Sequence, residues 1–471
     1  MSAQRSPELP AILSFDAGTL TSPVLPEDAT LRTWFTWDPR MEVFRAPALR
    51  YRDVAERFGV LGTRWEDRAR TWTPLALRLR ALPPPHPHQQ AALTAWQEAG
   101  GRGVVELPTG AGKTLLAVMA IHAIQRPTLV VVPTIELMRQ WAETLARHLD
   151  VGVGMVGGGC NERRALTVTT FDSAALHAEF HGAGHGLLVV DECHHLPAPR
   201  YRFIAEASLA PWRLGLTATL ARQDGGEAIV HHLLGPLVHA TDIRELEGRY
   251  LAPYDIETVE VSLTDQEQQV HDAARAVYLG FLRSQGLRLS EPGGWARFLA
   301  ASHRSAEGRD ALRGWRTQRA LALFSEGKRQ ALWEILQRHR EDRVLVFADD
   351  TETVYRLARA FLLPSLTHHT PLPERKALLA AFADGSLPVL LTSRVLNEGI
   401  DVPDARVGVV LSGSGSVREH VQRLGRVLRK RPGKRALLYE VVTHNTTERG
   451  ISERRRQHGA YRERPVEGEG T

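Results

Sequence analysis

The chain has 471 residues, which predicts about three domains and excludes a single small binding module. Hydrophobic residues make up 43% and charged residues 24% of the sequence, as in an ordinary globular protein, so a chain that is disordered as a whole is excluded. The formal net charge of +5 favours polyanionic partners.

Neither a membrane segment nor a disulfide framework is expected. The longest apolar runs, at 129–132 and 344–348, are far shorter than the roughly 18 to 20 residues of a membrane span. Residues 1–20 lack the basic start, apolar core and cleavage site of a signal peptide. The only two cysteines, Cys160 and Cys193, form no CxxC pair. We therefore expect a cytoplasmic protein without membrane association.

The first 80 residues mix short apolar stretches with turn signals, which predicts a small α/β or β-rich N-terminal domain over 1–80. The run at 83–87 contains four prolines. Because proline cannot continue a helix or a central strand, this run marks a linker between two domains.

Two later blocks, at 81–264 and 331–442, show apolar strands that alternate with helical stretches such as 115–124 and 135–149. Strands are predicted at 104–107, 128–132, 165–169, 186–190 and 213–216 in the first block, and at 344–348, 388–391, 407–411 and 436–441 in the second. This alternation is typical of βαβ units. The predicted fold class is therefore α/β, with two parallel-sheet domains.

Between these blocks, residues 265–330 have a helical pattern and carry 11 basic and 7 acidic side chains. Two readings are open: a solvated helical insert, or a helical subdomain that binds phosphates. Arg313, Arg316 and Arg319 are three residues apart and fall close to one face of a helix, so they are candidate DNA contacts. The charged tail at 443–471 predicts a short helix followed by disorder.

The strand at 104–107 is followed by a glycine-rich turn, Pro-Thr-Gly-Ala-Gly-Lys-Thr at 108–114, and then by an apolar helix. This context is typical of a phosphate-binding loop, in which backbone N–H groups face the phosphates. Lys113 is expected to reach the β and γ oxygens of ATP, and the Thr114 hydroxyl to ligate Mg²⁺. Only five of the 59 basic residues are lysines, and Lys113 is the only one before Lys328. The predicted ATP-binding residues are Thr109, Gly110, Ala111, Gly112, Lys113 and Thr114.

A second apolar strand, at 186–190, runs directly into Asp191 and Glu192. Ligands of open α/β sheets bind at the carboxyl ends of the strands. We expect Asp191 to hold Mg²⁺ and Glu192 to deprotonate the attacking water. His194, two residues further on, is a candidate for coupling this site to the second sheet.

With these two motifs in order, the sequence resembles the superfamily 2 helicases, and the resemblance covers some 340 residues. It implies Gln89 and Asp401 as further ATP contacts, and Thr217, Thr219 and Gln422 as coupling residues. It also implies that Arg426 and Arg429 reach the γ-phosphate as catalytic arginines. The implied contacts to the DNA backbone are Pro133, Thr134, Thr170, Thr392 and Ser393.

Within that superfamily the sequence is similar to the XPB-type DNA helicases, in the short form of archaea and bacteria. The acidic box ends in Cys193-His194, and the element Arg222-Gln223-Asp224 resembles the family's Arg-Glu-Asp, so Arg222 and Asp224 are implied DNA contacts. The resemblance implies two RecA-like domains, a thumb-like insert at 265–330 and a damage-recognition-like N-terminal domain.

The function implied is an ATP-dependent DNA helicase or translocase with 3'-5' polarity that uses Mg-ATP in DNA repair. The implied partners are single-stranded, duplex or forked DNA and an XPB-associated nuclease, and the chain is expected to be a monomer. Two alternatives stay open: an RNA helicase, although the DEAD type has Asp where this chain has His194, and an ATP-switched DNA clamp that does not separate strands.

Overall fold

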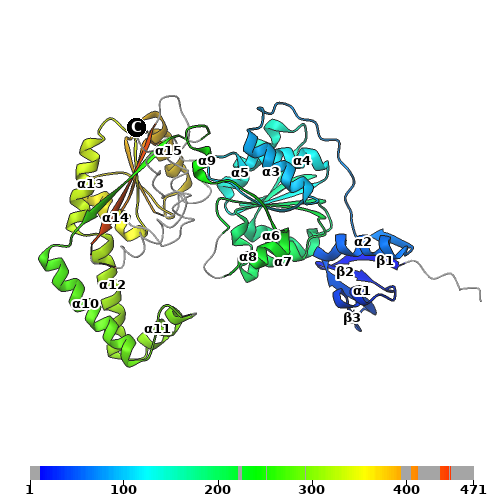
Figure 1. Ribbon diagram of the computed structural model, residues 1–471, viewed down its shortest axis with the longest axis horizontal. Coiled ribbons are helices and arrows are strands. Elements are labelled where there is room, and N and C mark those ends of the chain that lie inside the picture. Colours follow the sequence, from blue (N-terminus) through cyan, green and yellow to red (C-terminus); the bar gives the residue numbers. More distant parts are fainter. Residues whose placement is uncertain are drawn as a thin grey trace, which may run out of the picture. The chain divides into compact units, whose positions relative to one another are not determined.

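The computed structural model describes residues 11–220, 225–250, 252–291, 293–393, 405–411, 435–444 and 446. The chain divides into two compact units, Met1–Asp242 and Ile243–Thr471 (Figure 1). Each unit is built around a largely parallel sheet, so the predicted α/β class is confirmed. No helix of the described residues is both long and apolar enough to span a bilayer.

The first unit begins with a mixed sheet of five strands, ordered β3-β4-β2-β1-β5. Its core contains Leu13, Leu20 and Phe58, which are fully buried. The elements of this N-terminal domain are β1 (Ala11–Asp16), β2 (Thr19–Ser22), α1 (Ala29–Trp34), β3 (Thr36–Asp38), β4 (Val43–Pro47), the 3-10 helix η1 (Ala48–Arg50), α2 (Tyr51–Leu61) and β5 (Trp65–Arg68).

The larger sheet of this unit, called the first sheet from here on, has eight strands in the order β13-β6-β12-β11-β7-β10-β8-β9, and among its pairs only β8–β9 is antiparallel. Its strands are β6 (Arg102–Glu106), β7 (Thr128–Val132), β8 (Val153–Gly157), β9 (Cys160–Asn161), β10 (Leu166–Thr170), β11 (Leu187–Asp191), β12 (Trp212–Thr217) and β13 (Leu237–Ala240). Strands β10 and β11 are buried along their whole length, as expected for central strands that helices cover on both faces.

Six helices accompany this sheet: α3 (Pro87–Glu98), α4 (Lys113–Ile124), α5 (Ile135–His148), α6 (Phe171–His181), α7 (Pro199–Glu206) and α8 (Glu227–Leu234). Figure 1 shows α3, α4 and α5 on one side of the sheet and α6, α7 and α8 on the other. A 3-10 helix, η2 (Cys193–His195), follows β11.

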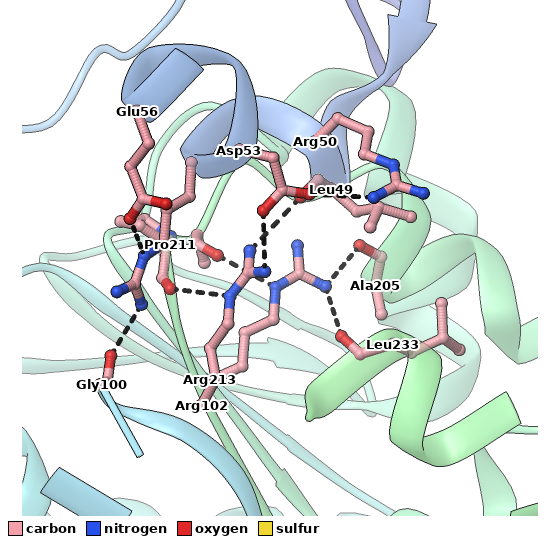
Figure 2. A network of polar contacts seen from close by, with 12 residues as sticks. Leu49, Arg50, Asp53, Glu56, Gly100, Arg102, Ala205, Pro211, Arg213 and Leu233 are labelled. Carbon is pink, nitrogen blue, oxygen red and sulfur yellow. Dashed lines mark hydrogen bonds and ion pairs between the residues drawn. The ribbon is translucent and has the colours of Figure 1, made fainter. Parts of the chain in front are cut away.

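Arg102 joins the N-terminal domain to this sheet, and the buried Arg213 lies beside it (Figure 2). Arg213, which is 1% exposed, donates hydrogen bonds to the carbonyl oxygens of four residues, Ala205, Ser208, Ala210 and Leu233. Arg102 donates to Pro211 O and, in the N-terminal domain, to Leu49 O, and its guanidinium lies 3.6 Å from Asp53. Burial lowers the pKa of Arg213 to about 9, and the neighbouring Arg102 acts in the same direction. These contacts make the first unit continuous across the predicted boundary near residue 80.

The second unit has a parallel sheet of six strands, called the second sheet from here on, in the order β14-β19-β18-β15-β17-β16. The strands are β14 (Tyr254–Val261), β15 (Val344–Phe347), β16 (Ser365–Leu366), β17 (Val389–Thr392), β18 (Val407–Val410) and β19 (Ala436–Thr443). The helices α9 (Ile243–Leu246), α13 (Glu326–Arg338), α14 (Thr351–Phe361) and α15 (Leu372–Asp384) complete it, and α13 contributes Leu332 and Ile335 to the sheet's core.

Strand β14 lies before the predicted domain boundary at 264 but belongs to the domain that follows it. Every residue of β14 pairs with β19, so this segment belongs to the second sheet and not to the first. Its alternation of partly buried and exposed residues is typical of an edge strand, which lacks the continuous apolar run by which the central strands were identified. Helix α13 likewise crosses the predicted boundary at 330, because its apolar face packs on the second sheet.

The segment between β14 and α13 is helical, as predicted. It consists of α10 (Asp265–Ser284), α11 (Gly294–Ser302) and α12 (Ala306–Leu323). In Figure 1, α10 and α12 run side by side away from the sheet, with α11 at the far end. Tyr278, Phe298 and Leu312 form a separate small core there, so the insert has an apolar centre of its own.

Candidate active site at the edge of the first sheet

Three adjacent strands of the first sheet bring the predicted nucleotide motifs to one edge. In the register of the sheet, Asp191 at the end of β11 lies beside Leu216, and Thr217 at the end of β12 lies beside Glu106. The phosphate loop follows β6 directly. The loop, the acidic box and the Thr217 motif are therefore neighbours, as ligand sites of open α/β sheets require.

The phosphate loop depends on two glycines with left-handed backbones, Gly110 at φ 88° and Gly112 at φ 85°. A Cβ atom on Gly112 would come within 2.1 Å of the Gln89 amide nitrogen, so only glycine fits there. Lys113 begins α4, and its Nζ donates to Leu107 O at 3.0 Å. The buried hydroxyl of Thr109 has no hydrogen-bond partner among the described residues. The loop thus offers an ammonium group, a hydroxyl and a helix N-terminus to an anionic ligand.

Gln89 braces this loop from α3. Its amide nitrogen donates to Ala111 O at 3.1 Å and to Gly112 O at 3.3 Å, while its oxygen accepts from the backbone N–H of His86. Gln89 is 1% exposed. This placement does not favour the implied contact of the Gln89 side chain with ATP, because both ends of the amide bind the protein itself.

The acidic box is held in place from two directions. Asp191, 6% exposed, accepts a hydrogen bond from the Trp141 indole at 2.9 Å and another from the Glu192 N–H at 3.0 Å. Glu192 has a left-handed backbone at φ 48°. Non-glycine residues in this conformation concentrate at functional sites, where the surrounding structure holds the strain.

His194 connects the acidic box to the Thr217 motif. Its ring is fully buried, with Nδ1 3.4 Å from Glu192 Oε2 and 3.0 Å from Thr217 Oγ1. The Thr217 hydroxyl donates to Thr219 O and accepts from the Thr219 N–H. The backbone carbonyl of Thr217 also accepts from the Leu107 N–H at 3.0 Å. Because Leu107 directly precedes the phosphate loop, this bond connects the Thr217 motif to the loop. The predicted coupling residues of this unit thus form one hydrogen-bonded group.

Two residues of this edge were missed from the sequence. Trp141 looked like an ordinary apolar residue of α5, yet it positions Asp191. Glu106 accepts from the Leu220 N–H at 2.8 Å. The pKa of its carboxyl is raised, because the effect of burial exceeds the opposing effects of the Leu220 bond and Lys113. Neither residue stands in a spaced motif, so no sequence signal separates it from the core.

The predicted DNA contacts of the first sheet lie at the starts of two helices. The Thr134 hydroxyl caps α5 by accepting from the Leu137 N–H, and the Thr170 hydroxyl caps α6 by accepting from the Ser173 N–H. Thr170 pairs with Val132 in the sheet, so the two helix starts share one edge, with Pro133 between strand and cap. Such helix N-termini suit phosphate oxygens.

The predicted contacts of the second unit are less accessible. Thr392 is fully buried, and its hydroxyl donates to Ser393 O, while Ser393 is 5% exposed. This placement does not support a direct contact between the Thr392 side chain and DNA.

The three arginines of α12 are exposed, as expected, but two have intramolecular partners. Arg313 pairs with Asp310 on the same helix. Arg319 lies 2.7 Å from Asp349 and 5.4 Å from the Trp315 ring centre. Arg316 makes no ion pair with the residues that the structure describes. The predicted residues Arg222, Asp224, Asp401, Gln422, Arg426 and Arg429 lie outside the described residues.

Three family models match the sequence. They are the Xeroderma pigmentosum group B helicase damage recognition domain over 13–69, the Type III restriction enzyme, res subunit over 83–222, and the Helicase conserved C-terminal domain over 327–431. The crystal structure of the Pyrococcus furiosus Hef helicase domain superposes with a TM-score of 0.56 at 20% identity, covering 79% of this chain and 98% of that one. This likeness shows the fold.

Two relatives extend the match over most of the chain. The DNA 3'-5' translocase XPB2 of Sulfurisphaera tokodaii is 38% identical over 89% of this chain and 95% of its own length. The DNA 3'-5' helicase XPB of Mycobacterium tuberculosis is 32% identical over 76% of this chain and 60% of its own length. Since the match to the first relative is nearly end to end and the damage recognition model adds the N-terminal domain, the chain belongs to the XPB-type family of superfamily 2 helicases.

Proposed function

We propose that the chain is a DNA-dependent ATPase that moves along DNA with 3'-5' polarity and couples Mg-ATP hydrolysis to the unwinding or remodelling of DNA in repair. The observation that carries the proposal is the hydrogen-bonded series at the edge of the first sheet, which links the phosphate loop to the acidic box through Thr217 and His194. The relatives named above are a DNA translocase and a DNA helicase, which favours DNA over RNA as the track.

The residues at this edge fit ATP and Mg²⁺. The phosphate loop supplies Lys113 and the N-terminus of α4 to phosphate oxygens, and the Thr109 hydroxyl has no partner of its own within the described structure. Mg²⁺ prefers oxygen ligands, which the Asp191 carboxylate and the Thr114 hydroxyl can supply. When bound, Mg²⁺ neutralises charge on the phosphates.

In this proposal Lys113 leaves Leu107 O and binds the β and γ phosphate oxygens. Glu192 takes the proton of the attacking water, and its strained backbone keeps the carboxylate pointed at that water. Arg426 and Arg429 stabilise the charge that develops on the transferred phosphoryl group, and Asp401 adds an ATP contact.

His194 transmits the state of the nucleotide. It lies between Glu192 and Thr217, so loss of the γ-phosphate that moves Glu192 also changes the His194 hydrogen bond. Thr219 and Gln422 carry this change onward. Thr134 and Thr170, with the helix N-termini that they cap, grip phosphates of the DNA backbone; such contacts carry no sequence information.

Two further expectations belong to this proposal. The chain acts as a monomer, which light scattering of the full chain in solution tests. It also cooperates with an XPB-associated nuclease, which co-purification with that nuclease tests. Both come from the family resemblance.

Translocation itself is tested by displacement of a triplex-forming oligonucleotide from duplex DNA. We expect ATP-dependent displacement by the wild-type protein and none by Lys113→Ala. Lys376→Ala is the matched control, because Lys376 is an exposed lysine of α15 outside the nucleotide motifs. ATP hydrolysis without displacement would instead support the ATP-switched clamp.

A further inference from the structure

A cavity of about 620 Å³ lies in the first unit, between the N-terminal domain and the first parallel sheet. Leu129 and Val156 of the sheet form part of its lining, α6 contributes one wall, and residues 68–75, which follow β5, contribute another. Its volume is within the range of small-ligand sites, roughly 300 to 1,000 Å³. Arg102, which donates to Leu49 O, and Arg52, which donates to Gly100 O, join these two domains, so the cavity is preformed.

The charge of this cavity is one-sided. Arg68, Arg163 and Arg164 line it, and no acidic side chain of the described residues does. Arg68 and Arg164 pair with Glu66 and Glu162. Arg163 is exposed and makes no ion pair with the described residues. Arg163 is therefore the cation available to an anionic ligand.

The cavity also presents hydrogen-bond donors. Trp72 is 7% exposed, and its indole N–H has no partner in the part of the chain that the structure describes. The Nε1 atom itself is closed to solvent, so Trp72 lines the cavity with its other atoms. The His177 and His181 rings lie 5.8 Å apart on α6. Burial lowers the pKa of His181, and the Arg163 charge adds to the effect.

Aromatic side chains surround the same space. Phe15 and Trp72 line it, and Phe180, which is 72% exposed, stands on α6. A ligand that uses both the aromatic faces and the arginine has a flat apolar part and an anionic part, as a nucleotide does.

The position of the cavity points to DNA as the source of that nucleotide. Thr169 and Ser173 line it, and Ser173 is hydrogen-bonded to Thr170, the predicted phosphate contact at the start of α6. The cavity therefore adjoins the path that we propose for the DNA backbone.

We propose that this cavity receives a single unpaired nucleotide swung out of bound DNA, with its base among Phe15, Trp72 and Phe180 and its phosphate at Arg163. The inference rests on the proposed function, because it requires DNA along the start of α6. Unpaired nucleotides cost least to swing out, so bulged or unpaired DNA is preferred over full duplex.

The test uses the full chain and three labelled duplexes: fully paired, with one unpaired 2-aminopurine, and with an abasic residue at the unpaired position. Affinity is measured by anisotropy and base stacking by 2-aminopurine fluorescence. We expect the unpaired base to strengthen binding by about tenfold over the paired and abasic duplexes, since a stacked base contributes roughly that much.

Two variants and their controls locate the effect. Arg163→Glu and Trp72→Phe should each reduce the preference for the unpaired base and the quenching of 2-aminopurine. Arg147→Glu makes the same charge change on α5 outside the cavity, and Trp295→Phe makes the same aromatic change on α11; both should keep the preference. Because Arg163 is exposed, its replacement does not endanger the fold.

Equal affinity of the wild-type protein for all three duplexes would overturn the inference, as would an unchanged preference in Arg163→Glu. Binding of free deoxyadenosine monophosphate that Arg163→Glu abolishes, without any preference for the unpaired base, would also overturn it, in favour of a free nucleotide. DNA-stimulated ATP hydrolysis is measured in parallel. If that stimulation is present and the preference is absent, this inference fails and the proposed function stands.

Discussion

The nucleotide edge of the first sheet and the arginine face of α12 were both expected to bind phosphates, yet they are built differently. At the edge, Glu192 and Gly112 have left-handed backbones, and buried hydrogen bonds connect the functional side chains. On α12 the arginines are exposed, and Arg313 and Arg319 have nearby carboxylates as partners. The spaced nucleotide motifs therefore predict side chains that are held in place by one another, whereas the charge pattern of α12 predicts only that its arginines are exposed.

The largest effect is expected at the nucleotide edge. Lys113→Ala should lower ATP hydrolysis by about 10³-fold or more, because it removes a charge on the transferring phosphate. Circular dichroism should be unchanged, since among the described residues the Lys113 side chain hydrogen-bonds only to Leu107 O. Steady-state ATP hydrolysis with single-stranded DNA is the measurement, and retained turnover would contradict the assignment of the loop.

Glu192→Gln should lower turnover by about 10² to 10³-fold while ATP binding is retained, because the amide cannot take the proton of the water. Fluorescent ATP-analogue binding and single-turnover hydrolysis separate the two effects. Loss of ATP affinity as large as in Lys113→Ala would show that Glu192 holds the nucleotide instead.

Arg426→Ala and Arg429→Ala should each lower turnover by at least about 10²-fold, as loss of a transition-state charge contact does. Nucleotide affinity should change much less, because the phosphate loop and acidic box belong to the first unit. A variant with normal turnover would show that its arginine does not act on the phosphoryl group.

Trp141→Phe should raise the Mg²⁺ concentration needed for half-maximal ATP hydrolysis by about tenfold, because it removes the hydrogen bond that orients Asp191. The measurement is ATP hydrolysis as a function of Mg²⁺ concentration. Trp96→Phe is the matched control: Trp96 is equally buried, but its indole donates to Arg213 O. The same Mg²⁺ shift in both variants would point to a general packing effect.

The smallest effect is expected on α12. If Arg316 meets DNA, Arg316→Glu should reduce the log–log salt slope of DNA binding by roughly 0.7 to 0.9, the value of one phosphate contact. Arg313→Glu should change it less, because Asp310 already partners that side chain. Arg359→Glu on α14 is the control, and equal slopes in all three variants would leave α12 a solvated helix.

The sequence predicted the central strands of both sheets well, because continuous apolar runs such as the one in β11 mark them. It missed β14, whose pattern is that of an edge strand. The motifs that contain Lys113, Asp191 and Glu192 predicted that these residues follow strands of one sheet. In the structure those strands, β6 and β11, are the two neighbours of β12.

The tertiary partners could not be predicted. Trp141 and Glu106 bind residues 50 and 114 positions away in the chain, and Arg213 donates to Leu233, 20 positions away; no short-range pattern encodes such contacts. An arginine-rich composition also hides the difference between Arg213, which is buried among carbonyl oxygens, and the exposed arginines of α12.

The most direct test of the central claim is steady-state ATP hydrolysis by the full chain without nucleic acid and with RNA, single-stranded DNA, duplex DNA or forked DNA in parallel. We expect hydrolysis that DNA stimulates, that RNA does not stimulate, and that Lys113→Ala abolishes. Stimulation by RNA alone, or hydrolysis that no nucleic acid changes, would contradict it.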